Sequence, residues 1–93
     1  MVTLSAELVF HIFHANSLKD KRQVCRSIVD KARHRFNASV AEVKTQDILQ
    51  TLTIGIAVVS GDTEHAQNSL EEIIRYMEGQ AADAELTDVR RDR

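Results

Sequence analysis

Residues 2–13 read Val2-Thr-Leu-Ser-Ala-Glu-Leu-Val-Phe-His-Ile-Phe13, and apolar side chains recur at every second position. The even-numbered residues from 2 to 12 are all apolar, whereas the odd-numbered ones include Glu7 and His11. A period of two is typical of a β-strand that buries one of its faces. We therefore predict a strand over residues 2–13 whose even-numbered side chains point into the core.

The next segment changes to a period of about 3.6 residues, which indicates an amphipathic helix over residues 17–36. Ser17 follows Asn16 and is the expected N-cap, because its hydroxyl can accept a backbone N–H of the first turn. Asn37 marks the expected helix end. The apolar residues that share one arc of this helix are Leu18, Val24, Cys25, Ile28, Val29, Ala32 and Phe36.

Four further elements follow from the same patterns. Residues 50–59 alternate between apolar and small side chains and predict another strand, and Ser60-Gly61-Asp62 ends it and caps a helix over 63–78. Gly79 is the expected stop of that helix. Shorter strands are expected over residues 38–44 and 84–90.

The predicted order is β-α-β-β-α-β in a single domain that spans residues 1–93. Right-handed crossovers place both helices on one face of a four-stranded antiparallel sheet, which is the ferredoxin-like arrangement of the α+β class. The strands over 38–44 and 84–90 become the edges of the sheet. Because many unrelated functions use this fold, the fold alone does not identify an activity.

The composition is that of a globular protein, with 43% hydrophobic and 28% charged residues among 93. The longest apolar run, Ile54 to Val59, is too short to span a bilayer, and residues 1–7 lack the layout of a signal peptide. Cys25 is the single cysteine, so no internal disulfide forms. We expect a cytoplasmic protein without a membrane segment.

Several runs of residues resemble a known family. They are Ser17-Leu-Lys-Asp-Lys-Arg22, Arg35-Phe-Asn-Ala-Ser-Val-Ala-Glu-Val43, Gln46-Asp47 and Gly55-Ile-Ala-Val-Val-Ser60. Together they are similar to the YlxP-like family of small bacterial proteins, and the resemblance covers nearly the whole chain in order.

The resemblance implies a ferredoxin-like fold and a bacterial cytoplasmic protein of unknown function. Genes of this family often lie beside those for ribosome-binding factor A and a translation initiation factor, which implies a link to RNA or the ribosome. This chain departs from the family at two loops. It has Phe13-His-Ala-Asn16 where relatives place Pro-Gly, and it lacks the aromatic residue that often follows Gln46-Asp47.

The helix over residues 17–36 carries most of the positive charge of the chain. It holds seven Lys or Arg against two Asp, although the formal net charge of the whole chain is −2. On a helical wheel Lys19, Arg22, Arg26 and Arg33 fall within about 60° of one another, beside the apolar arc. Such a stripe of about 20 Å can meet successive phosphates and release their counterions.

Lys19, Lys21 and Arg22 also lie in the first turn, where unpaired backbone N–H groups attract anions. Lys21 falls inside the apolar arc, so we expect its stem to lie on the core and its ammonium to reach water. Arg35, in the last turn, is expected to favour the helix dipole.

The leading functional hypothesis is a non-enzymatic protein that binds structured RNA or a ribosome assembly intermediate. The candidate phosphate-binding residues are Lys19, Lys21, Arg22, Arg26 and Arg33. The open face of the strand over 50–59 carries no aromatic residue, so we expect phosphates or shape to be recognised rather than stacked bases. In the alternative interpretation of the cations, they pair with carboxylates of the second helix, which include Glu64, Glu71, Glu72 and Glu78.

A second functional hypothesis uses the other face of the sheet. The open face is small and partly aliphatic, with Val9, Ala57 and Val59, and a second copy of the chain would cover it. The edge strand over 38–44 offers a different dimer contact by extending the sheet. We therefore also consider a homodimeric interaction or regulatory module, against the alternative of a monomer.

Neither a catalytic site nor a metal or cofactor site is predicted. His11 and His14 point to opposite sides of an extended strand, which is poor ligand geometry. Cys25 lies in the apolar arc and is expected to be an inert core thiol. The three glycines form no phosphate-binding loop.

Overall fold

The computed structural model describes residues 1–92 and contains the predicted order of elements. The elements are β1 (Val2–Ile12), α1 (Leu18–Arg35), β2 (Ser39–Lys44), β3 (Thr51–Ser60), α2 (Thr63–Gln80) and β4 (Ala84–Asp92). Each predicted element is present, with ends that differ from the prediction by two residues or fewer. Residues 1–92 share one sheet and one core, and residue 93 of the single domain expected over 1–93 lies outside the described residues.

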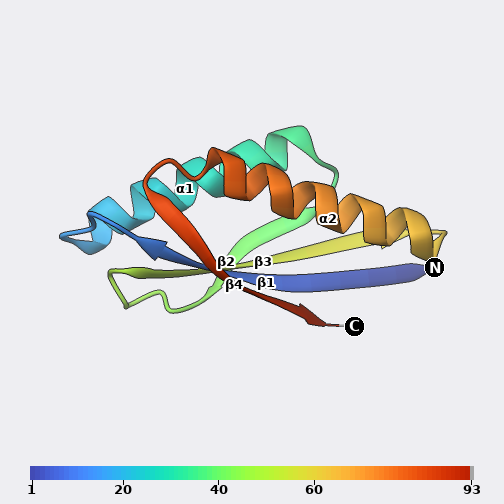
Figure 1. Cartoon of the computed structure of the whole chain (residues 1–93), viewed down its shortest axis with the longest axis horizontal. Coiled ribbons are helices and arrows are strands. Elements are labelled where there is room, and N and C mark those ends of the chain that lie inside the picture. Colours follow the sequence, from blue (N-terminus) through green and yellow to red (C-terminus); the bar gives the residue numbers. More distant parts are fainter. Residues whose placement is uncertain (93) are drawn as a thin grey trace.

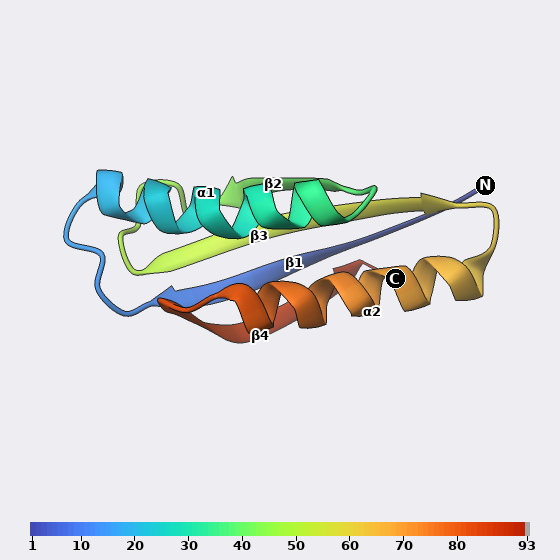
Figure 2. The same ribbon diagram turned by 90° about the horizontal axis from the view of Figure 1, so that it is seen from above.

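The four strands form one antiparallel sheet in the order β2-β3-β1-β4, so β2 and β4 are its edges as predicted. Both helices lie on the same face of this sheet (Figure 1). Seen from above, α1 and α2 run side by side in opposite directions (Figure 2). The ferredoxin-like α+β fold is thereby confirmed.

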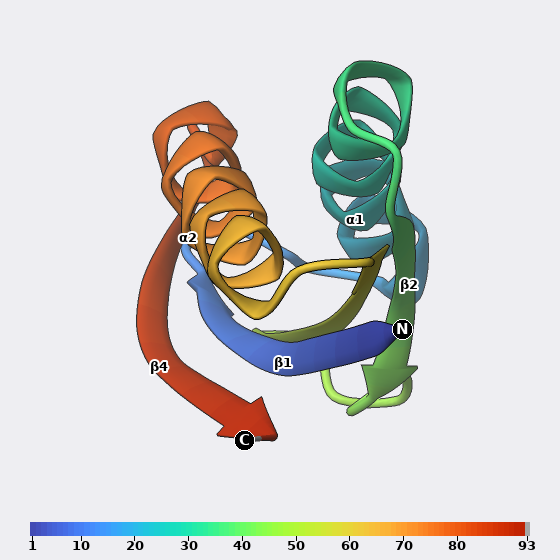
Figure 3. The same cartoon turned by 90° about the vertical axis from the view of Figure 1, so that its right-hand side faces the viewer.

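The core fills the space between the helices and the sheet, which curves around them (Figure 3). The even-numbered residues of β1 supply its centre, and Leu8, Phe10 and Ile12 are at most 1% exposed. β3 contributes Leu52, Ile54 and its other even-numbered side chains in the same way. The period-two pattern therefore assigns the buried face correctly.

Two helix starts are confirmed and one helix end is wrong. The side chain of Ser17 accepts the backbone N–H of Asp20, and Asp62 accepts that of His65, so both residues are N-caps. Gly79 does not end α2, which continues to Gln80. Gly79 keeps a negative φ, so the helix passes through it as through any other residue.

One residue of the open sheet face is unexpectedly buried. Thr53 is only 2% exposed, and the turn after β2 contacts its hydroxyl. Thr45 in that turn has a positive φ of 61°, and its Oγ1 lies 3.1 Å from Oγ1 of Thr53. A positive φ is uncommon for a residue with a Cβ, so the tertiary contacts of this turn must compensate for it.

Candidate functional site: a buried lysine beside an arginine groove

Lys21 is the most deeply buried charged residue of the described chain, with 2% exposure. Its ammonium donates hydrogen bonds to the carbonyl oxygens of Thr45 and Ile48, the second at 2.7 Å. Its Nζ also lies 3.3 Å from Oε2 of Glu42 on β2. Two carbonyl oxygens therefore accept hydrogen bonds from the ammonium, and the carboxylate of Glu42 balances its charge, although Glu42 Oε2 is buried without a hydrogen-bond partner.

The prediction that the ammonium of Lys21 reaches water is therefore wrong. The helical wheel places Lys21 correctly in the apolar arc, but the wheel does not contain the turn at Thr45–Ile48 that supplies two carbonyl acceptors. A phosphate outside the protein has no access to this ammonium. Lys21 is accordingly withdrawn from the candidate phosphate-binding residues.

Lys21 joins two of the segments on which the family resemblance rests. It belongs to Ser17–Arg22, and its two carbonyl acceptors stand on either side of Gln46-Asp47. The ammonium thus fixes the turn that presents Gln46 and Asp47, both of which are exposed. Sequence reasoning missed Glu42 as the partner of Lys21, because nothing in the chain spacing indicates that pair.

Three of the other cations lie together in one open hollow of about 300 Å³ between α1 and β2. We call it the arginine groove; its cations are Arg22, Arg26 and Arg33, and its acidic members are Asp30 and Glu42. All three arginines are exposed. Three of the four residues of the predicted stripe are thus brought together on the side of α1 that faces β2.

Lys19 is exposed in the first turn of α1 and does not line the arginine groove. The backbone around it is already satisfied by the chain, since the backbone N–H of Asp20 donates to Ser17 Oγ at 3.1 Å. Asp20 Oδ2 in turn accepts the backbone N–H of Asn16 at 3.1 Å. Because of this carboxylate, the first turn of α1 is a weaker anion-binding site than the sequence indicates.

Arg33 also has a structural contact. Its Nε donates a hydrogen bond of 2.8 Å to the carbonyl oxygen of Val40, on the outer edge of β2. This contact covers a carbonyl that an edge strand would otherwise present to another chain. A guanidinium has five N–H donors, so four of those of Arg33 remain for other partners.

The cations of α1 do not pair with the carboxylates of α2. Among residues 1–92, no salt bridge within 4.0 Å joins the two helices. Glu71 of α2 instead accepts two hydrogen bonds from Arg91 of β4, at 2.6 and 2.9 Å. These bonds from Arg91 lower the pKa of the Glu71 carboxyl. The pairing of helix-one cations with helix-two carboxylates is therefore excluded for the described residues.

Cys25 lines the arginine groove but is a poor nucleophile. Partial burial raises the pKa of its thiol above the ordinary value of 9.0, and the nearby charge of Glu42 raises it further. Its Sγ lies 4.0 Å from Oε1 of Glu42. Because the thiolate is the reactive form, this environment keeps the thiol protonated and unreactive near neutral pH.

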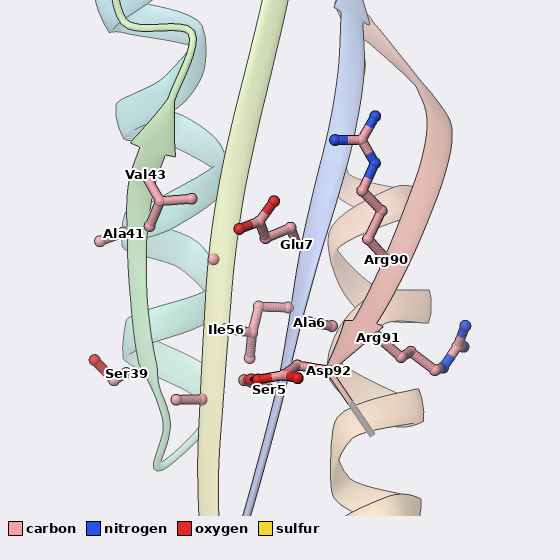
Figure 4. Close-up of a pocket in the computed structure, with 12 residues that line it drawn as sticks. Ser5, Ala6, Glu7, Ser39, Ala41, Val43, Ile56, Arg90, Arg91 and Asp92 are labelled. Atoms are coloured by element: carbon pink, nitrogen blue, oxygen red, sulfur yellow. The ribbon is translucent and has the colours of Figure 1, made fainter.

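The opposite face of the sheet carries a hollow of about 500 Å³. Figure 4 shows Ala41 and Val43 of β2, Glu7 of β1 and Arg90 of β4 around it. Gly55 lines this hollow and has no side chain to fill it. A Cβ there would come within 2.8 Å of Val43 Cγ1. Val59, farther along β3, is 65% exposed.

The edge strand β4 is poorly suited to pairing with another chain. Its exposed residues are mostly charged, and the register against β1 shifts between Val9 and Phe10. At that irregularity the hydroxyl of Thr87 donates to the carbonyl oxygen of Val9 at 3.0 Å. Charged side chains and bulges of this kind discourage edge-to-edge association.

Arg35 is held by aromatic rings rather than by the helix dipole alone. Its Cζ lies 4.8 Å from the ring centroid of Tyr76 on α2 and 5.7 Å from that of Phe36. Such cation–π contacts attach the end of α1 to α2. The sequence predicted its place in the last turn but not this partner.

Within residues 1–92, no three His, Cys, Asp or Glu side chains are grouped so that they could hold a metal ion. No helix in the same range is long and apolar enough to cross a membrane. The four histidines that the sequence contains are each exposed.

Comparison with known proteins places the chain in a family. Residues 3–91 match the model of a family described as "Protein of unknown function (DUF503)". The chain is also 33% identical, over 73 residues, to "Uncharacterized protein YlxP" of Bacillus subtilis (strain 168). That match covers 78% of this chain and 79% of the relative. The YlxP-like resemblance is thereby confirmed.

A solved structure supports the fold independently. The chain is similar to the solution NMR structure of a de novo designed protein with a ferredoxin fold, with a TM-score of 0.59. The likeness covers 98% of this chain and 83% of the designed protein, at 18% sequence identity. At this identity the comparison shows a shared fold and carries no information about function.

Proposed function

The chain belongs to the DUF503 family of proteins of unknown function, and we propose that it is a non-enzymatic binder of the phosphate backbone of structured RNA. The observation that carries the proposal is the arginine groove, in which Arg22, Arg26 and Arg33 line one hollow. None of the three makes a salt bridge to a carboxylate within residues 1–92. A ribosome assembly intermediate is one source of such RNA.

The geometry of α1 suits a run of phosphates. Arg22 and Arg33 are eleven residues apart, which corresponds to about 16 Å along the helix. A guanidinium presents a planar fork of N–H donors that matches the oxygens of a phosphate. Lys19 extends the same stripe toward the start of the helix. Phosphate contacts of this kind fix the position of an RNA without reading its sequence.

The buried lysine supports the arginine groove indirectly. Glu42 lines the groove, and its carboxylate would be an intramolecular competitor for the arginines. Because its Oε2 lies 3.3 Å from Lys21 Nζ, the negative charge of Glu42 is already balanced from the side of the core. Glu42 therefore competes less with an external anion for the guanidinium groups of the arginine groove.

The test is a binding titration of a fluorescently labelled RNA hairpin, followed by anisotropy. The double variant Arg22→Glu/Arg26→Glu should lose the binding while its thermal unfolding midpoint stays close to that of the wild type. The matched control is Lys31→Glu/Arg75→Glu, which makes the same change in net charge at exposed positions outside the groove. An RNA affinity that Arg22→Glu/Arg26→Glu leaves unchanged refutes the proposal.

A second candidate function is a homodimeric interaction module that uses the open sheet face. The observation in its favour is the exposure of two apolar side chains on this face, Val43 at 43%, which lines the hollow over Gly55, and Val59 at 65%, farther along β3. The two edges are less suitable, because Arg33 covers a carbonyl of β2 and β4 is charged and irregular.

Light scattering after size-exclusion chromatography distinguishes the two candidates. The interaction module is favoured if the wild type is a dimer and Val59→Asp converts it to a monomer. Charge reversal of Arg22 and Arg26 should then leave the dimer unchanged. A monomer at all concentrations favours the RNA-binding proposal. Both candidates include a cytoplasmic location, which stays a prediction.

A further inference from the structure

The arginine groove also contains a carboxylate whose hydrogen-bonding capacity is largely unused. Glu42 lines the groove together with Arg22, Arg26 and Arg33, and it belongs to β2, the strand that lies beside α1 (Figure 3). Its Oε2 is buried without a hydrogen-bond partner in the described chain, and Lys21 Nζ approaches it at an ion-pair distance of 3.3 Å. Buried polar atoms without a partner are few in native proteins, so this one requires an explanation.

The other oxygen of the Glu42 carboxylate is also nearly free of donors. In residues 1–92 the only hydrogen bond that Oε1 accepts comes from the thiol of Cys25, whose Sγ lies 4.0 Å away. A thiol is a weak donor, whereas an ionised carboxylate offers about four acceptor sites. No arginine of the groove forms a salt bridge with Glu42 within the same residues. The groove therefore combines guanidinium donors with an acceptor that the protein itself leaves almost unused.

The Glu42 carboxylate is fixed from the side of the core. Its ion-pair partner Lys21 is buried, and the carbonyl oxygens of Thr45 and Ile48 hold the ammonium of Lys21 in place. The side chain of Glu42 is 20% exposed, whereas Asp30, the other acid of the groove, is exposed and forms no salt bridge in the described chain. An acceptor that is held before the ligand arrives loses little conformational entropy on binding.

A phosphate alone does not match this lining. A phosphodiester satisfies the guanidinium groups, but it has no hydrogen to donate to Glu42. The lining also includes apolar side chains, Val29 of α1 and Ala41 of β2, which suit the C–H groups of a sugar. The matching ligand therefore joins a negative charge to a sugar that carries a hydrogen-bond donor.

The ribose of RNA has these properties. Its 2′-hydroxyl is a donor and lies on the carbon next to the one that carries the 3′-phosphate, and deoxyribose lacks it. In a paired stem the 2′-hydroxyls line the wide, shallow groove of the A-form helix, where a side chain can reach them. The amino groups of the bases are engaged in pairing there, which makes the hydroxyl the better match for an acceptor beside the phosphates.

We infer that the carboxylate of Glu42 accepts the 2′-hydroxyl of a ribose whose neighbouring phosphates bind the arginines, so that the arginine groove selects RNA over DNA. Oε1 is the accepting atom, because Oε2 is buried. This inference rests on the proposed function and specifies its ligand. The arginines supply affinity for any phosphate backbone, and Glu42 determines which sugar is accepted.

The experiment compares one hairpin in two forms, as RNA and with fluorine in place of every 2′-hydroxyl, by anisotropy at one salt concentration. Fluorine keeps the A-form helix and the phosphates but removes the donor. The wild type should bind the RNA form about 10-fold more tightly, as expected for one hydrogen bond to a charged acceptor. The readout is the ratio of the two affinities, because this ratio does not depend on the fraction of protein that is folded.

Glu42→Met should bring this ratio close to one, because methionine has a similar length and cannot accept the hydroxyl. The loss of a negative charge should at the same time strengthen binding of the 2′-fluoro form to the arginines. The matched control is Asp30→Met, which removes the other carboxylate of the groove. It should strengthen binding of both forms alike and leave their ratio at the wild-type value.

A second readout uses the unaltered protein, since Glu42→Met leaves the ammonium of Lys21 without its ion-pair partner. The carboxyl carbon resonance of Glu42, followed by NMR, should shift further at saturation with the RNA hairpin than with the 2′-fluoro hairpin. Equal shifts with the two forms would contradict the contact without any substitution.

The outcomes distinguish the inference from the proposed function. Equal affinities of the wild type for the two hairpins, together with loss of both in Arg22→Glu/Arg26→Glu, overturn the role of Glu42 and keep the RNA-binding proposal. A preference for the RNA form that Glu42→Met retains also overturns that role, because another residue then recognises the hydroxyl. Failure of the wild type to bind either hairpin overturns both.

Discussion

Lys21 and Arg22 are adjacent on α1, yet the charge of Lys21 is buried and that of Arg22 is exposed. The ammonium of Lys21 is buried, donates to two carbonyl oxygens and lies at ion-pair distance from the carboxylate of Glu42. The guanidinium of Arg22 is exposed in the arginine groove, and no carboxylate lies within 4.0 Å of it among residues 1–92. One step along the helix turns the side chain by about 100°, from the core to the solvent.

This difference shows that the charge of a helix does not measure its capacity to bind anions. The +5 of residues 17–36 includes cations that stabilise the fold and cations that are available to a partner. Arg33 lies between the two cases, because one of its N–H groups is bonded to Val40 while the rest of its guanidinium lines the groove. Substitutions at these positions can therefore separate stability from binding.

The largest effect on stability is expected from Lys21→Met. The substitution leaves the carbonyl oxygens of Thr45 and Ile48 without their donor and Glu42 without its ion-pair partner. Removal of one partner of a buried ion pair costs about 3 kcal/mol. Urea denaturation followed by circular dichroism measures the loss. The control is Lys19→Met, an exposed position in the same turn, whose effect should stay within about 0.5 kcal/mol. Equal stability of Lys21→Met and wild type would show that the buried contacts contribute nothing.

A smaller effect is expected from Arg33→Ala. It removes the bond from Nε to the carbonyl oxygen of Val40 and should destabilise the protein by about 1 kcal/mol. Because that carbonyl lies on the outer edge of β2, hydrogen exchange should also rise for the backbone amides of β2. Arg33→Lys is the control for charge, since it keeps the cation and removes the fork. Unchanged hydrogen exchange in β2 would mean that the bond from Arg33 to Val40 does not stabilise this strand.

The smallest effect is expected for the exposed pair of Glu71 and Arg91. The hydrogen bonds from Arg91 lower the pKa of Glu71 from its ordinary value of 4.5, so the ionised form is favoured in the folded state. The pair therefore stabilises the fold above pH 4.5, and this contribution is lost as the pH falls through the lowered pKa.

Because both side chains are more than 40% exposed, the pair contributes at most about 1 kcal/mol. Urea titrations of wild type and Arg91→Ala should differ slightly at pH 7 and converge as the solution is acidified below pH 4.5. A difference that grows on acidification would contradict the assignment.

The fold could be predicted from sequence because it depends on periodicity. The alternation in residues 2–12 and 51–60 and the apolar arcs of the two helices fix which faces meet, and these patterns are local. The end of α2 was misplaced because glycine tolerates a helical conformation when the turns before it are well packed, as Gly79 does here.

The candidate site could be predicted only in part. The wheel placed Arg22, Arg26 and Arg33 on one side of α1, and the structure brings them into one groove. It could not show that β2 rather than α2 lies opposite them, nor that a turn with Thr45 at φ 61° supplies carbonyl acceptors to Lys21. Contacts between residues more than twenty positions apart leave no periodic signal.

The salt dependence of RNA binding tests the central claim most directly, because each phosphate contact releases counterions and a buried cation releases none. The logarithm of the hairpin affinity should fall with the logarithm of salt concentration with a slope of about −2 to −4 for the wild type. Arg22→Gln should make that slope shallower by about one unit, while Lys21→Met, measured where it remains folded, should leave it unchanged. A slope that Arg22→Gln does not change, or that Lys21→Met changes equally, would contradict the division of α1 into a buried structural cation and exposed binding cations.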